Sequence, residues 1–287
     1  MSTEAVITEI RKKVHTDMHG RKAISFQYPI LSPYVVGVRR FLNIFKNRIN
    51  KKLARKKTGD FLPCVIARHS SPLFRKLGNS NPELQHGKIK NLTVAIDSLN
   101  GLIINPGEVF SFWNIVGAPT KKKGYVTGML LSAGKVIEGT GGGLCQLSNL
   151  LYWLLLHAPV EIVERQHHSM DVFPDSGRSI PFGAGATIYY NLIDLKVKNT
   201  SKFPIQLKLW LSESQLKGQV LSTHSVKEKY HLEEGLHYFI QTKNGVYRYN
   251  EVWRSVLIEG QVVGKSKVMT NCAPVLYEAP HIDFCIE

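Results

Sequence analysis

Three consecutive glycines, Gly141, Gly142 and Gly143, stand directly before a run of residues, 146–157, that is almost wholly apolar. Successive glycines let the backbone turn tightly or approach another group closely. The apolar run has the length of a buried helix, and Pro159 marks its end. We therefore expect this helix, which follows a glycine-rich loop, to lie at the centre of the hydrophobic core.

Hydrophobic periodicity elsewhere indicates an α+β fold. Apolar residues recur every three or four positions in residues 35–57 and 91–104, which predicts two further helices, the first of them basic. Period-two patterns and turn residues predict an antiparallel sheet against the central helix and a β-rich C-terminal region. The expected strands are 125–131, 135–138, 160–165, 186–198, 203–211 and parts of the chain from 220 onward, with turns at Gly218, Asn244-Gly245, Gly260 and Gly264.

The chain length of 287 residues suits one large domain or two modest ones. Hydrophobic residues make up 43% of the chain and charged residues 21%, which are the values of a folded globular protein. We expect three regions along it. These are a basic helical N-terminal region at 1–60, a core at 61–215 that holds the glycine loop, and a β-rich extension at 216–287.

The formal charge of +15 is concentrated near the N-terminus, where residues 1–57 hold fourteen Lys or Arg and three acids. Such clusters attract phosphates of nucleic acids, anionic lipids or cell-wall polymers, or they form a solvated helix face. We do not expect a nucleic-acid partner, because no known DNA- or RNA-binding motif accompanies the basic runs. For the basic helix at 35–57 we expect packing on the protein itself, with docking on a membrane surface as the alternative.

The N-terminal residues do not have the features of a secretory signal, because residues 1–10 include Glu4 and Glu9 and no apolar run. The longest apolar stretch, residues 150–156, is far shorter than the roughly 18 to 20 residues that span a bilayer. We therefore expect a cytoplasmic protein. Peripheral contact with the membrane through the basic N-terminal region is the alternative.

The cysteines form no Cys-x-x-Cys pair, so we expect free thiols. The four cysteines are Cys64, Cys145, Cys272 and Cys285. A metal site would need ligands at the spacings of known zinc sites, and the available residues lack them. The residues considered are Cys145, His157, His167 and His168. We expect neither a metal nor another cofactor.

Cys145 stands in the first turn of the expected central helix. The free amides and the dipole at a helix N-terminus favour a thiolate and can stabilise an oxyanion beside it. His168, after the next strand, is a candidate base, and Asp194 a candidate carboxylate that orients it. Gln146 and the helix-start amides are the candidate oxyanion donors. This is the order of residues in transglutaminase-like and papain-like enzymes.

A structural role for the same residues remains the alternative. A buried cysteine after a glycine loop can serve as a small hydrophobic residue. Asp194 can equally pair with Lys196 or Arg165.

Five ordered sequence blocks resemble the VanW family and cover about a third of the chain. The blocks are 105–112, Gly117 with Gly124-Tyr125, Gly141 to Gln146 with Ser148, Arg165 with His168, and 193–199. The resemblance implies an accessory role in glycopeptide resistance and the bacterial cell envelope. We expect the substrate-binding residues among Gly141, Gly142, Gly143, Gln146, Ser148 and Arg165.

This chain departs from the family's pattern in two segments. The family often has an acid within Gly-x-Asp-Ala-Thr, where this chain has Gly185, and Thr-Thr where this chain has Asn149-Leu150. If the missing acid is the third catalytic group in relatives, catalysis here is in doubt.

Two functions follow from the sequence. The first is cysteine-dependent acyl or amide chemistry on a peptidoglycan-related peptide. The second is a non-catalytic module that binds an anionic cell-wall precursor, helped by the basic N-terminal region. Replacing Cys145 by Ser separates them, because only the first function requires the thiol.

Overall fold

The computed structural model describes residues 3–19, 32–74, 83–132, 135–167, 169–172, 174–175 and 180–286. Within them it has the expected α+β class, with antiparallel sheets, several helices and a β-rich C-terminal part. In the described part of the chain, no helix combines the length and the apolar character needed to cross a bilayer.

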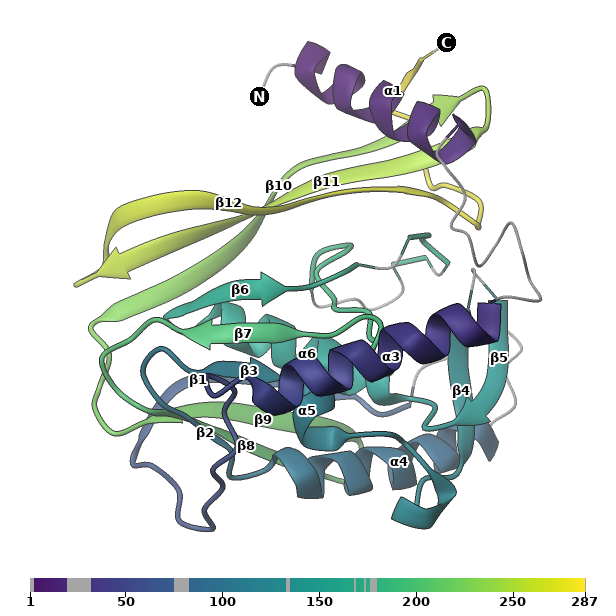
Figure 1. Cartoon of the computed structure of the whole chain (residues 1–287). Coiled ribbons are helices and arrows are strands. Elements are labelled where there is room, and N and C mark those ends of the chain that lie inside the picture. The colour runs from purple at the N-terminus through teal and green to yellow at the C-terminus, as the bar shows by residue number, and fades with distance from the viewer. Residues whose placement is uncertain are drawn as a thin grey trace.

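The central helix is confirmed as α6, Leu144–Leu156, in which ten of thirteen residues are buried. A four-stranded sheet in the order β1-β9-β8-β2 packs against it through β1 (Cys64–Pro72) and β9 (Gln215–Ser222). Figure 1 shows α6 between this sheet and the smaller sheet β3-β7-β6. The remaining strands of both sheets are β2 (Ile103–Ile104), β8 (Ile205–Leu211), β3 (Val109–Ser111), β6 (Val160–Glu164) and β7 (Lys196–Asn199).

Helix α4, Glu83–Leu99, completes the cover of the core beside the hairpin of β4 (Thr127–Ser132) and β5 (Lys135–Thr140). The helix expected at 91–104 is confirmed in part: α4 ends at Leu99, because the chain turns at Gly101, whose φ is +82°. A short helix, α5 (Phe112–Val116), follows β3, and a 3-10 turn, η2 (Lys121–Lys123), follows α5.

Two sequence expectations in the core are wrong. Of residues 186–198, expected as one strand, only those in β7 form one, because the chain first turns at Asn191, whose φ is +49°. Gly218, expected in a turn, lies inside β9. A Cβ there would lie 3.1 Å from Leu154 Cδ2, so the glycine lets β9 approach α6 closely.

The C-terminal region is a second sheet in the order β12-β11-β10-β13. The predicted turns at 244–245 and at Gly260 are confirmed, whereas Gly264 lies within β12. Helix α1, Thr3–His19, covers this sheet with buried Val6 and Ile10 (Figure 1). The strands are β10 (Glu228–Thr242), β11 (Gly245–Ile258), β12 (Gln261–Pro274) and β13 (Phe284–Cys285).

Helix α3, Ser32–Ile49, lies against the core and departs from the expectation for residues 35–57. It ends at Ile49, and the apolar side chains expected to pack on the protein are exposed. The helix is instead held by polar bonds, in which Arg40 Nε donates to Tyr190 O at 3.2 Å and Asn43 Nδ2 to Asn191 O at 2.7 Å.

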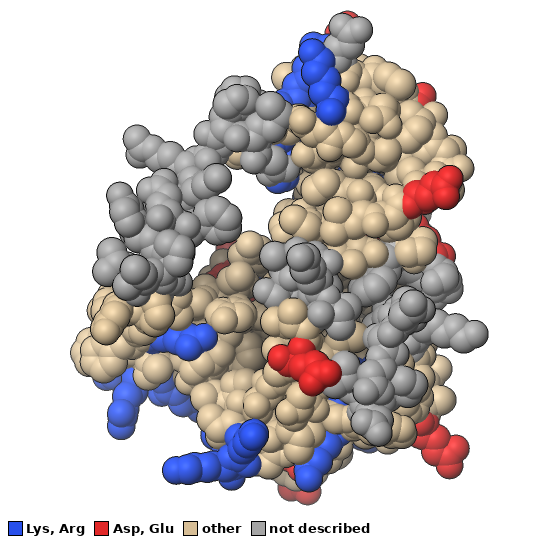
Figure 2. All heavy atoms as spheres, turned by 90° about the vertical axis from the view of Figure 1, so that its right-hand side faces the viewer, with Lys and Arg blue, Asp and Glu red and all other residues tan. Residues whose placement is uncertain are grey.

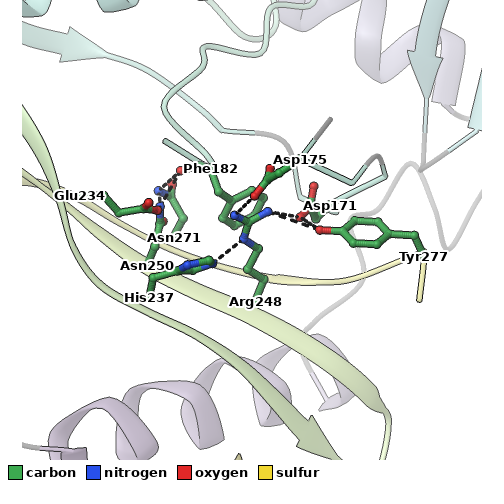
Figure 3. A network of polar contacts seen from close by, with 9 residues as sticks. All are labelled: Asp171, Asp175, Phe182, Glu234, His237, Arg248, Asn250, Asn271 and Tyr277. Atoms are coloured by element: carbon green, nitrogen blue, oxygen red, sulfur yellow. Dashed lines mark hydrogen bonds and ion pairs between the residues drawn. The ribbon is translucent and has the colours of Figure 1, made fainter. Parts of the chain in front are cut away.

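A buried polar network joins the C-terminal sheet to the loop before β7 (Figure 3). Arg248 is 2% exposed and donates from Nη1 to Asp171 Oδ2 at 3.1 Å and from Nε to His237 Nε2 at 2.8 Å. It also bonds Asp175 and stacks on the ring of Phe182. Because a buried charge is tolerated only when it is paired, these bonds fix the loop on the sheet.

We expect Arg248→Ala to lower the free energy of unfolding by about 3 to 5 kcal/mol, because it leaves the Asp171 carboxylate buried without its cation. Urea denaturation measures the change. The matched control is Lys198→Ala, which breaks the exposed Lys198–Glu161 pair at 3.6 Å and should cost about 0 to 1 kcal/mol. Equal losses in the two variants would contradict a fixing role for Arg248.

Candidate functional site

The glycine loop before α6 bonds to its own chain. The N–H groups of Gly141, Gly142 and Gly143 donate to Val126 O, Gly139 O and Met129 O at 3.1, 3.3 and 3.0 Å. Gly142 lies so close to the β4 backbone that a Cβ would be 2.2 Å from the carbonyl carbon of Gly128. These amides are therefore satisfied within the protein, and the glycines serve the close approach of β4.

Two polar residues of α4 complete the loop. Asn91 Nδ2 donates to Gly142 O at 2.9 Å and to Val126 O at 3.0 Å, and its Oδ1 accepts from Val126 N at 2.8 Å. Lys88 is buried against Gly143 and bonds Leu73 O. Neither residue was expected from the sequence. The available signal was their position in the apolar stripe of α4, because Asn91 lies four residues before Ala95 and Lys88 lies four residues before Leu92.

The first turns of α6 bind two other segments through polar side chains. Gln146 Nε2 donates to Pro72 O at 2.7 Å and to Ser71 Oγ at 3.0 Å, at the end of β1. Ser148 Oγ donates to Ala186 O at 2.6 Å. The candidate substrate-binding side chains Gln146 and Ser148 thus tie α6 to β1 and to the loop at 183–188.

Cys145 is partly exposed, and its Sγ lies 4.0 Å from Ile188 O. Burial raises the pKa of the thiol above its ordinary value. A raised pKa means less thiolate at neutral pH, which is the opposite of what an activated nucleophile requires.

Asp194 is 5% exposed and its carboxylate accepts from Ser111 Oγ at 2.6 Å and from Trp113 N at 3.1 Å. Ser111 is the N-cap of α5, so Asp194 fixes the start of that helix. Burial raises the pKa of Asp194, although the bonds from Ser111 and Trp113 oppose the shift. The alternative partner Lys196 pairs instead with Glu164, at 2.8 Å.

The arrangement of Cys145, His168 and Asp194 stays a prediction, because His168 lies outside the described residues. The described partners of the other two differ: Cys145 is next to Ile188, and Asp194 bonds the start of α5. Among the described residues, no group of three or more His, Cys, Asp or Glu side chains is placed to hold a metal ion.

Arg165 holds the loop that follows β6. Its Nε donates to Gly185 O at 2.8 Å, a second nitrogen bonds Gly183 O, and the guanidinium lies 4.9 Å from the centre of the Tyr152 ring. Burial lowers the pKa of Arg165. The side chain thereby connects the loop to α6.

The two departures from the family's pattern, Asn149 and Gly185, lie against each other. Asn149 Oδ1 accepts from Ala186 N at 2.7 Å. A Cβ at Gly185 would lie 2.5 Å from the same oxygen. The amide of Asn149 therefore takes the space that a side chain at position 185 would need, so the two departures fit together.

Known proteins are similar to this chain over the residues of the site. The family model described as "VanW like protein" matches residues 87–221. "Vancomycin B-type resistance protein VanW" of Enterococcus faecalis is 30% identical over 263 residues, which are 91% of this chain and 96% of that protein. "Uncharacterized protein YoaR" of Bacillus subtilis is 30% identical over 133 residues, 45% of this chain and 40% of that protein. No solved structure matched the chain.

We expect iodoacetamide to label Cys145 slowly at pH 8, and more slowly than exposed Cys285. The reason is that burial disfavours the thiolate, which is the reacting form. Residue-resolved mass spectrometry of the intact, folded protein measures both rates. Faster labelling of Cys145 than of Cys285 at neutral pH would point to an activated thiol.

We expect Gly142→Ala to lower the free energy of unfolding by about 1 to 3 kcal/mol, because the new Cβ overlaps backbone atoms of β4 that cannot move aside. Thermal unfolding followed by circular dichroism measures it. Gly37→Ala in α3 is the control: its Cβ meets nothing within 4 Å, and alanine favours a helix. A Gly142→Ala protein as stable as the control would mean that the loop is not closely packed.

Proposed function

The chain belongs to the VanW family, and on that premise we propose that it is an accessory protein of glycopeptide resistance. The observation that supports the proposal is similarity along almost the whole length of both chains to the vancomycin B-type resistance protein, 91% of this chain and 96% of the relative. Similarity over 263 residues extends well beyond residues 87–221, which the family model matches, so it concerns most of the chain and not the core alone.

Within that role, the protein works by binding and not by covalent chemistry at Cys145. Burial raises the pKa of this thiol, and Gln146, the candidate oxyanion donor, already donates to Pro72 and Ser71. Asp194 bonds the start of α5. Each of these groups has a structural partner, which supports a structural role for Asp194 and for the first turn of α6.

The ligand class that suits a binding role is an anionic cell-wall precursor. The net charge of +15 favours a partner with phosphates or carboxylates. The glycine loop is a poor candidate for the contact, because its three N–H groups donate to carbonyls of the same chain. The basic N-terminal region supplies the attraction instead.

Complementation of a deletion tests the proposal in a glycopeptide-resistant host that carries the gene. We expect deletion to lower the inhibitory concentration of vancomycin, and both the wild type and Cys145→Ser to restore it. Ser keeps the size and polarity of Cys but is a much weaker nucleophile, so a binding protein should tolerate it. The soluble muropeptides of the two complemented strains should also be identical by mass spectrometry.

The other outcomes have separate meanings. Suppose that the wild type restores resistance but the Cys145→Ser protein, equally stable and abundant, does not. That result would establish thiol chemistry and overturn the binding mode. A deletion strain with unchanged susceptibility would overturn the accessory role itself. Gly142→Ala is the control for lost stability, because it destabilises the same turn and keeps the thiol; resistance that persists in it but fails in Cys145→Ser is not an effect of stability.

A further inference from the structure

Helix α3 is attached to the protein by its polar side. Its partly buried residues are Val36, Arg40, Asn43 and Asn47. Arg40 and Asn43 bond the backbone at 190 and 191, and the Arg40 guanidinium also lies 5.5 Å from the centre of the Tyr189 ring. At the other end, Arg55 donates to Asn47 O at 2.9 Å. Polar bonds along the helix therefore fix which side faces outward.

The outward side is apolar. Phe41, Val38 and Phe45 are 67%, 61% and 57% exposed. At about 100° of rotation per residue, the middle of this stripe lies roughly opposite the middle of the attached side. The full stripe consists of Tyr34, Val38, Phe41, Leu42, Phe45 and Ile49. Soluble proteins seldom expose large contiguous apolar surfaces without a partner for them.

Helix α1 of the same chain shows the usual arrangement. Its Val6 and Ile10 are fully buried against the C-terminal sheet, beside Ile240 and Tyr249. The two N-terminal helices thus present opposite sides to the protein. Only α3 leaves its apolar side available to another surface.

Basic residues border the apolar stripe. Arg39 and Lys46 lie beside one edge of the stripe, and Arg48 lies beside the other. Two further exposed basic residues, Lys51 and Lys52, come directly after the helix. Residues 18–59 contain no Asp or Glu. Figure 2 shows several Lys and Arg side chains at the lower left of the molecule in that view. The partner surface must therefore combine apolar material with negative charge.

We propose that α3 is a docking helix for the surface of an anionic lipid bilayer, lying in the plane of the interface. Aromatic and aliphatic side chains on one side of a helix, with Lys and Arg at its borders, suit acyl chains below and anionic headgroups around them. A dimer through this side would pair the stripe with itself and bring Arg39, Lys46 and Arg48 close to their own copies. Like charges at such a contact oppose it.

Vesicle co-sedimentation tests the apolar part. We expect the full chain to bind vesicles of phosphatidylcholine mixed with phosphatidylglycerol, and to lose binding on phosphatidylcholine alone or at high salt. Phe41→Ser with Phe45→Ser should weaken binding at least about tenfold, because two exposed rings no longer enter the bilayer. Val262→Ser with Val263→Ser, at positions 60% and 58% exposed on β12, is the matched control and should bind normally.

A second pair of variants tests the charges. Arg39→Glu with Lys46→Glu should weaken binding to the anionic vesicles by at least about tenfold. Lys121→Glu with Lys122→Glu changes the net charge equally at exposed positions of η2, outside α3, and should have a smaller effect. Circular dichroism confirms that each variant is folded.

Three results would overturn the proposal. One is no binding of the wild type to anionic vesicles. Another is equal loss in the α3 variants and their controls, which would locate the contact elsewhere. The third is a dimer, measured by sedimentation equilibrium, that Phe41→Ser with Phe45→Ser dissociates. The proposal does not rest on the role in glycopeptide resistance, because vesicle binding is measured without any resistance phenotype.

Discussion

A helix that is apolar on nearly every side must be surrounded, and the burial of α6 sets the arrangement of the core. One sheet covers it through β1 and β9, while α4 and the smaller sheet occupy other sides. Burial alone does not fix which segment lies where. The few polar groups of its first turns do so, because Gln146 and Ser148 each bond one particular carbonyl on β1 or on the loop at 183–188.

The sequence predicted those elements whose signal is local. Helix α6 and the hairpin at 244–245 follow from an apolar run and from an Asn-Gly turn, which need no knowledge of distant residues. The strand expected at 186–198 forms only in β7, because the chain turns at Asn191 first, and an alternating pattern does not reveal such a turn. For α3 the amphipathic pattern was correct, but periodicity does not reveal which side faces the protein.

The candidate site was predictable in its location but not in its contacts. Glycines next to an apolar run drew attention to Cys145, Gln146 and Ser148, and the structure places all three at one junction. Their partners are backbone atoms at 72, 186 and 188, and backbone carbonyls leave no signature in a sequence. Asn91 was not expected for the same reason, because its side-chain amide bonds the backbone carbonyls of Val126, just before β4, and of Gly142 in the glycine loop.

Helix α1 has a consequence for how the protein is made. Its Val6 and Ile10 are synthesised long before the side chains that bury them, such as Ile240, Cys272 and Ile286. The core around α6 can close earlier, since domains fold as units during synthesis. Throughout translation α1 therefore has no permanent apolar partner. Helix α1 docks on a sheet whose strands come more than 200 residues later in the sequence (Figure 1), so its apolar side can be buried only after that sheet has been made.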